Sequence, residues 1–111
     1  MEKEIKTWLE DIRQSIEEIE EFLPEKRNFI DFQKDLKTRK AIERNIEIIG
    51  EAVQRILKIN PEIKITNARK IVDTRNRIIH GYDSISVDII WAIAVQDLEK
   101  LKTEIIRLLE E

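Results

Sequence analysis

The stretch RNRIIHGY, residues 75–82, gathers the side chains of this sequence that are best suited to chemistry on a phosphate. It holds the only histidine and the only tyrosine among the 111 residues. An ordinary histidine pKa of about 6.5 lets His80 take up or release a proton near neutral pH. Arg75 is always cationic, and its planar fork of donors matches phosphate oxygens. This pair of residue types therefore points to a reaction at a phosphodiester.

RNA carries its own nucleophile for such a reaction, the 2′-OH beside the scissile phosphate. His80 would take the proton of this hydroxyl, and Arg75 would stabilise the charge that builds up on the phosphate. Neither step requires a metal ion or a cofactor, and we expect none. A second histidine for the leaving 5′-oxygen would come from a second copy of the chain, because each chain has only one.

The spacing within the motif limits how these groups meet. Asn76 and His80 are one helical turn apart and share a face, whereas Arg75 and His80 lie about 140° apart around an ideal helix. They could converge if the helix ends at His80, as the following Gly81 suggests. They could also converge across the axis of a homodimer, where a single sequence builds a composite cleft.

A purely structural interpretation of the same residues stays open. A histidine before a helix-ending glycine often only interacts with the last carbonyls and the helix dipole. Arg75 and Arg77 would then be surface residues, and Tyr82 a core residue with an exposed hydroxyl. Spacing alone favours this second interpretation.

The composition indicates one helical domain over residues 1–111. Hydrophobic residues make up 41% and charged residues 39%, while glycine and proline number two each, which leaves little turn chemistry for a sheet. The absence of cysteine excludes disulfides and thiolate metal sites. No apolar stretch approaches the roughly 18 residues of a membrane span, and the charged N-terminus has no signal region. We therefore expect a cytoplasmic protein with no membrane association.

Apolar residues recur at steps of three and four through most of the chain, which predicts amphipathic helices. We expect an all-α antiparallel bundle of four long helices plus a short one, joined by short connections. The predicted helices cover residues 3–23, 25–36, 38–60, 67–80 and 87–111.

Local signals place the ends of these helices. Pro24 ends the first helix, Thr38 caps the third, and Asn60 followed by proline stops it. Thr66 or Asn67 caps the fourth helix.

Three further predictions concern the last, the fourth and the third of these helices. Ser86 caps the last helix, with Asp88 in its first turn. The buried stripe of the fourth helix is expected to be Ile71, Val72, Ile78 and Ile79. Gly50 lies inside the third helix, where glycine costs about 1 kcal/mol relative to alanine, so we expect another helix to approach closely there.

Charge is distributed unevenly along the chain. Residues 1–25 hold nine acidic and three basic side chains, whereas residues 64–82 hold five basic and one acidic. A polyanion would be attracted to the second region and repelled by the first, which makes Arg69, Lys70 and Arg77 candidates for RNA binding. The alternative is that both regions are ordinary solvated helix faces.

A resemblance to a known family adds to this interpretation. The R-x-x-x-x-H-x-Y pattern of Arg75, His80 and Tyr82 resembles the motif of the HepT-like branch of the HEPN superfamily, and Asn76 matches the polar residue that usually follows the arginine. RNIEIIGEAVQRI (residues 44–56), with its IGEA, resembles the long-helix motif of the family. NPEI and SVDIIWAIAVQDLEKL also fit, so the resemblance covers roughly residues 30–105.

The resemblance implies an all-helical homodimer that cleaves RNA without a metal, with Arg75, Asn76 and His80 as catalytic residues. Such proteins are commonly the toxins of type II or type VII toxin–antitoxin pairs. The implied partner is a minimal nucleotidyltransferase antitoxin that transfers AMP from ATP to the motif tyrosine, here Tyr82. An adenylyl group there would add bulk and negative charge beside the cleft.

The sequence departs from the family at KITNARKIVDT, where a tryptophan and an aspartate-containing turn are often found. Glu51 and Arg44 resemble recurring polar residues of the long helix, and a structural salt bridge or a dimer contact is as good an interpretation for them as catalysis. Two alternatives to the ribonuclease remain: a non-catalytic helical binding module that partners a nucleotidyltransferase, and a purely structural helical dimer.

Overall fold

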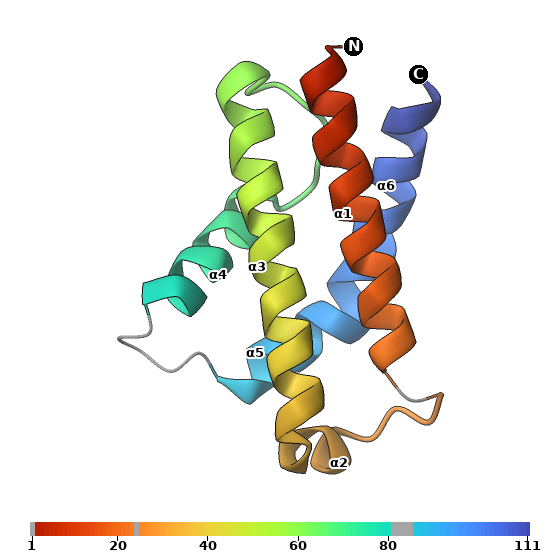
Figure 1. The fold of residues 1–111 in the computed structure, drawn as a ribbon, viewed down its shortest axis with the longest axis vertical. Coiled ribbons are helices and arrows are strands. Elements are labelled where there is room, and N and C mark those ends of the chain that lie inside the picture. The colour runs from red at the N-terminus through yellow and green to blue at the C-terminus, as the bar shows by residue number, and fades with distance from the viewer. Residues whose placement is uncertain (1, 24, 81–85) are drawn as a thin grey trace.

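The protein is built from helices, as the sequence predicts (Figure 1). The computed structural model describes residues 2–23, 25–80 and 86–111, and every regular element within these ranges is helical. In chain order the elements are α1 (Lys3–Phe22), α2 (Phe29–Lys34), α3 (Leu36–Ile59), α4 (Ala68–His80), α5 (Val87–Ala92), the π-helix η1 (Ile93–Asp97) and α6 (Leu98–Glu110).

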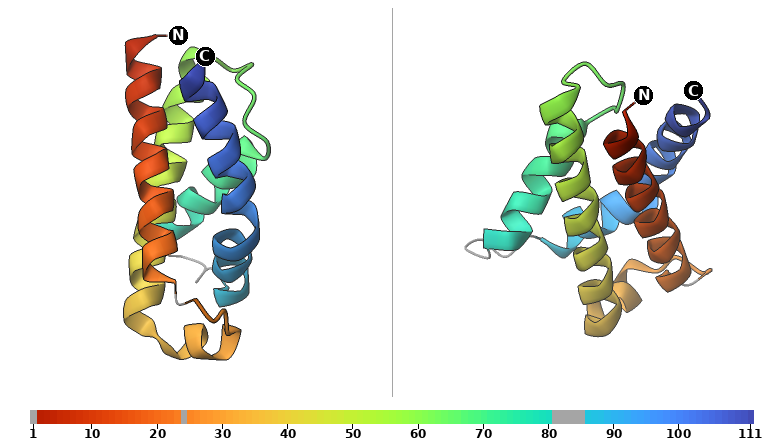
Figure 2. Two further views of the ribbon diagram at one scale, coloured as in Figure 1. Left: turned by 90° about the vertical axis from the view of Figure 1, so that its right-hand side faces the viewer. Right: turned by 45° about the horizontal axis from the view of Figure 1, so that its top comes forward.

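The helices form two layers. The molecule is 18 Å thick along its shortest axis, and a helix with its side chains is about 10–12 Å across. Helices α1 and α3 run antiparallel in one layer, and α4 lies with α5, η1 and α6 in the other (Figures 1 and 2). Helix α3 packs against α1 on one side and α4 on the other, so it connects the N-terminal helix to the RNRIIH segment.

The core consists of the apolar stripes that the spacing predicts. The fully enclosed side chains come from α1, α3 and α6, where apolar residues follow one another at steps of three and four. They are Leu9, Ile12, Ile16, Ile19, Ile42, Val53, Ile56 and Ile105.

The start of α3 differs from the prediction. Asp35, not Thr38, is the N-cap, and its carboxylate accepts hydrogen bonds from the Thr38 backbone N–H at 3.0 Å and hydroxyl at 2.6 Å. Thr38 lies inside the first turn and serves as the donor of this cap. Aspartate is among the strongest N-cap residues because its oxygens satisfy the free N–H groups of the first turn.

The start of α4 follows a left-handed residue. Asn67 has a φ of 59°, a region that asparagine tolerates better than most residues, and its carbonyl accepts from the Ile71 N–H. Thr66 donates its hydroxyl to the Glu104 carboxylate at 2.6 Å and so joins α4 to α6. Asn67 therefore directly precedes α4, and the prediction that Thr66 or Asn67 caps this helix through its side chain stays a prediction.

The outer turn of α4 is more exposed than predicted. Ile71 and Val72 are buried and Ile78 is half-buried, but Ile79 is 43% exposed. Helix α4 packs against α3, and its buried residues Ile71, Val72 and Thr74 belong to its first two turns, whereas Ile79 lies in its last turn. The prediction that Ile79 belongs to the buried stripe is wrong.

The last helix is also not continuous. Ser86 caps α5 by accepting from the Asp88 N–H, as predicted, but residues 93–97 form the π-helix η1 before α6 begins. The steps from Ile90 to Ala94 and Leu98 keep helical spacing, so the apolar pattern does not indicate this π-helix. Trp91 packs on Phe29 and Phe32 of the α2 segment, with ring centroids 5.9 and 5.0 Å away.

Two of the predicted helix ends, at Pro24 and Gly81, lie outside the described residues. The predicted stop at Asn60 is confirmed, because Asn60 is the C-cap of α3 and its N–H donates to the Ile56 carbonyl.

Candidate functional site

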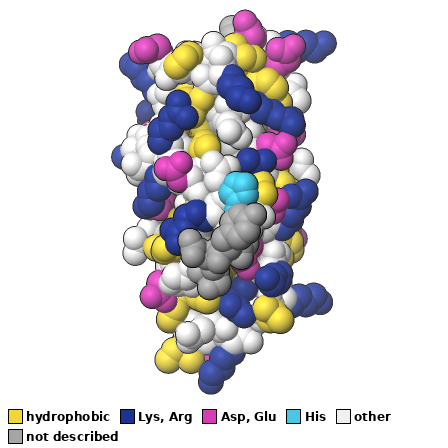
Figure 3. Space-filling model, turned by 90° about the vertical axis from the view of Figure 1, so that its left-hand side faces the viewer, with side chains coloured by type: hydrophobic (Ala, Val, Ile, Leu, Met, Phe, Trp, Pro, Cys, Tyr) yellow, Lys and Arg dark blue, Asp and Glu magenta, His cyan; other side chains and the backbone are white. Residues whose placement is uncertain are grey.

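Helix α4 presents the candidate residues on two of its sides. Arg75 and Asn76 are half-buried and face α3, whereas Arg77 and His80 are exposed. Dark blue lysine and arginine side chains lie near the cyan histidine on this face of the molecule, with hydrophobic and acidic side chains among them (Figure 3). The described surface near the histidine therefore carries several cations.

Gly50 of α3 makes the crossing of α3 and α4 unusually close. A Cβ at position 50 would lie 2.9 Å from the Arg75 Cγ, closer still to the Arg75 Cβ, and 3.2 Å from the Ile71 carbonyl oxygen. Gly50 is buried, and the expected close approach of another helix is thereby confirmed. The stem of the motif arginine occupies the space that a side chain at position 50 would need.

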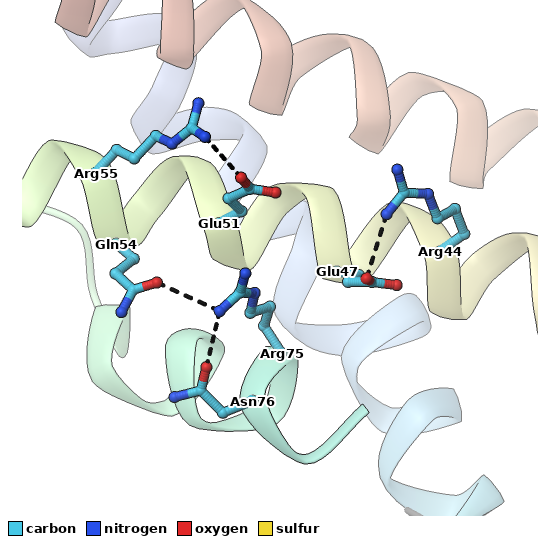
Figure 4. Close-up of polar contacts among 7 residues, drawn as sticks. All are labelled: Arg44, Glu47, Glu51, Gln54, Arg55, Arg75 and Asn76. Carbon is cyan, nitrogen blue, oxygen red and sulfur yellow. Dashed lines mark hydrogen bonds and ion pairs between the residues drawn. The ribbon is translucent and has the colours of Figure 1, made fainter. Parts of the chain in front are cut away.

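Beyond this crossing the Arg75 side chain runs along α3 (Figure 4). Its Nη1 donates to Asn76 Oδ1 at 3.0 Å and to Gln54 Oε1 at 3.4 Å, the second contact being long for a strong hydrogen bond. The Arg75 Nε is buried, and no acceptor among the described residues lies within hydrogen-bond reach of it.

The two acidic side chains that flank Gly50 form ion pairs with arginines of α3. Glu47 pairs with Arg44 at 3.3 Å and Glu51 with Arg55 at 2.8 Å, both within α3 (Figure 4). Within the described ranges, no carboxylate forms an ion pair with Arg75. Arg75 is thus bonded to two neutral amides and has no ion-pair partner in the described part of the chain. For Glu51 and Arg44, the structure supports the salt-bridge interpretation.

The other candidate residues lie at the end of α4, in its first turns or outside the described residues. His80 is the last described residue of α4, so the predicted helix end at this point is not tested. Tyr82, the predicted modification site, lies outside the described residues. Arg69 and Lys70 are exposed, and Lys70 pairs with Asp97 of η1 at 3.3 Å. Lys70 therefore already links α4 to η1.

Sequence reasoning missed Gln54. Its amide is one of the two groups that hold the Arg75 guanidinium. It lies four residues after Gly50, so both share one face of α3. The close approach expected at Gly50 could have indicated Gln54, because the residue one turn further along the same face of α3 also meets the approaching helix.

Among residues 2–23, 25–80 and 86–111, no three His, Cys, Asp or Glu side chains are grouped so that they could hold a metal ion. No helix within these ranges combines the length and the apolar character needed to cross a bilayer.

The fold and the site together define a small all-α protein with an arginine, an asparagine and a histidine at the end of one helix. The family model described as "Ribonuclease HepT-like" matches residues 12–108. The chain belongs to the ribonuclease HepT-like family, and the resemblance drawn from its motifs is confirmed.

Individual relatives agree with this assignment. Over 106 residues the chain is 39% identical to "Probable ribonuclease HepT" of Thermococcus cleftensis, covering 92% of this chain and 93% of that protein. It is 34% identical over 97 residues to "Putative RNase MJ0127" of Methanocaldococcus jannaschii, covering 84% and 77%. All of this chain matches half of "Gamma-glutamylcyclotransferase and putative RNase MJ0434" of the same organism, with 31% identity over 112 residues. No solved structure matches the chain.

Proposed function

We propose that this protein is a metal-independent endoribonuclease that acts as a homodimer. Residues 1–111 form one domain, and Arg75, Asn76 and His80 of the two copies line a shared cleft. The observation that carries the proposal is the state of Arg75, a half-buried cation held by amides with no carboxylate partner among the described residues. Such a cation suits an anionic substrate, because its charge is not already neutralised.

The reaction balances without any further group. His80 of one copy takes the proton of the RNA 2′-OH, and the O2′–P bond forms as the P–O5′ bond breaks. His80 of the second copy donates a proton to the leaving 5′-oxygen. Arg75 stabilises the charge that develops on the non-bridging phosphate oxygens, and Asn76 holds Arg75 in place. The products are a 2′,3′-cyclic phosphate and a free 5′-hydroxyl.

The biological setting belongs to the same proposal. The protein is the toxin of a toxin–antitoxin pair in the cytoplasm, and its partner is a minimal nucleotidyltransferase that adds AMP to Tyr82. Its membership in the ribonuclease HepT-like family supports this setting. The exposed cations Arg69 and Arg77 guide RNA to the site.

Cleavage of labelled RNA in the presence of EDTA tests the proposal. The wild type should cut, and Arg75→Ala or His80→Ala should each lower the rate by about 100-fold or more, the usual contribution of one proton-transfer group or charge-stabilising donor. Circular dichroism should show that both variants keep their helices.

Mixing wild-type chains with His80→Ala chains tests the shared cleft. If one cleft uses His80 of both copies, an equal mixture should keep about a quarter of the wild-type rate, since only a quarter of the dimers then carry two histidines, whereas independent sites would keep about half. Equal cleavage by the wild type and both single variants would instead support the non-catalytic binding module.

A further inference from the structure

The stem of Arg75 has little freedom, because α3 confines it. Its Cβ and Cγ fill the space above Gly50, and the Ile71 carbonyl lies beside the same spot. The Nε is buried without an acceptor among the described residues. Only the tip of the guanidinium remains to be oriented, and Nη1 is the atom that the surrounding residues hold.

Gln54 is the group on α3 that meets this tip. It lies one turn beyond Gly50 on the same face, and its Oε1 accepts from Arg75 Nη1 at 3.4 Å (Figure 4). Asn76, the other acceptor, belongs to α4 itself and moves with Arg75. Gln54 is therefore the contact that fixes the guanidinium relative to the rest of the fold.

The neutral charge of Gln54 matters as much as its position. A carboxylate there would form a charge-assisted pair with the guanidinium, and such a pair is about twice as strong as a neutral hydrogen bond. The carboxylates on either side of Gly50, at Glu47 and Glu51, are both engaged by arginines of α3. The charge of Arg75 thus stays available although two glutamates flank Gly50 in α3.

We propose that Gln54 is a positioning residue for Arg75: its amide orients the guanidinium toward the RNA phosphate and, being neutral, leaves the cationic charge free to bind that phosphate. The inference rests on the proposed function, since it assigns Gln54 a role through Arg75. Gln54 contacts neither the RNA nor the reacting atoms.

The test is the near-isosteric substitution Gln54→Glu in the full chain. The new carboxylate should pair with Arg75, so the melting temperature should stay equal or rise while kcat falls by about tenfold to 100-fold. KM for a short RNA should change less than kcat, because the other cations still attract the backbone. A purely structural role for Gln54 would move stability and activity together.

Gln14→Glu is the matched control. It adds the same charge on the exposed surface of α1, and its cleavage rate should equal that of the wild type. If Gln54→Glu cleaves as fast as this control while Arg75→Ala is inactive, the inference is wrong and the proposed function stands. A lowered melting temperature for Gln54→Glu would also contradict it. If Arg75→Ala itself cleaves at the wild-type rate, the proposed function and the inference both fail.

Discussion

Two arginines of helix α4 have different surroundings. Arg75 and Arg77 are two positions apart in one helix, yet the first is half-buried against α3 and the second is exposed. The spacing explains the difference, because Arg75 lies on the line of Ile71 and Ile78 and Arg77 does not. The motif arginine is thus the one whose side chain the fold can orient.

Asp35 provides a prediction at this scale. The Thr38 hydroxyl, and then the Thr38 N–H, hold the pKa of the Asp35 carboxyl below its usual value of 3.8. Because the pKa of Asp35 is lowered in the folded state, its ionised carboxylate stabilises the fold at neutral pH. This stabilisation is lost as the pH falls through the pKa of the folded state. Asp35→Ala should therefore lower the melting temperature at pH 7, and the difference from the wild type should shrink below about pH 4.

Thermal unfolding followed by circular dichroism between pH 7 and pH 2 measures this effect. Asp11→Ala is the control, since it removes an exposed carboxylate in the middle of α1 that caps no helix. A gap between Asp35→Ala and wild type that stays constant over the whole pH range would show that the cap does not act through its charge.

At the scale of elements, the crossing of α3 and α4 determines how the site is built. Gly50 lets the two helices approach until the Arg75 stem lies against the α3 backbone. Polar links also join α4 and the residues before it to the end of the chain, from Lys70 to Asp97 and from neighbouring Thr66 to Glu104. The position of α4 therefore depends on one close helix crossing and on α6 and η1.

Gly50→Ala tests this crossing. The added methyl group would overlap the Arg75 stem, so the variant should lose about 1–3 kcal/mol of unfolding free energy despite the better helix propensity of alanine. In an Arg75→Gly background the obstructing Cβ and Cγ are gone, and the same substitution should be close to neutral. Urea unfolding of the four chains gives both values.

The wild-type and the Arg75→Gly backgrounds serve as controls for each other. An equal loss of stability from Gly50→Ala with and without the Arg75 side chain would mean that the glycine serves another purpose. Cleavage by Gly50→Ala should fall as well, because α4 must shift for the methyl group to fit.

On the scale of the whole molecule, the uneven charge of the sequence becomes a separation in space. The acidic helix α1 packs on one side of α3, and α4 with its cations packs on the other side (Figure 1). An RNA strand that approaches α4 is thereby kept apart from the acidic surface of α1. This arrangement suits a molecule that binds RNA on one face only.

The proposed modification gives a prediction at this scale. Incubation of the protein with ATP, Mg²⁺ and the cognate nucleotidyltransferase should raise its mass by one or more AMP units and abolish RNA cleavage. The reason is that each AMP adds bulk and negative charge within two residues of His80. Intact-mass spectrometry and the cleavage assay measure the two effects.

Tyr82→Phe is the control for this experiment. It should keep the unmodified mass and remain active after the same treatment. Addition of AMP to Tyr82→Phe, or full activity of the modified wild type, would contradict the proposal.

Much of this protein follows from its sequence alone. Apolar steps of three and four determine where the helices run and which faces are buried, because a helix places such residues on one side. The helix end at Asn60 and the cap at Ser86 are local effects and were predicted for that reason. Arg75 and His80 became candidates by residue type, and the resemblance to the family added Asn76; their catalytic roles stay predictions.

The tertiary structure decided what depends on contacts between distant segments. Asn76 was visible in the motif, but the contact with Gln54 needed the crossing of two helices, since 21 positions separate Gln54 from Arg75. The π-helix and the exposure of Ile79 likewise depend on how neighbouring layers pack, which apolar spacing does not encode. The sequence determined which groups could act on a phosphate. Only the folded chain decided which neighbours hold Arg75, and among the described residues these neighbours are amides that form no ion pair with it.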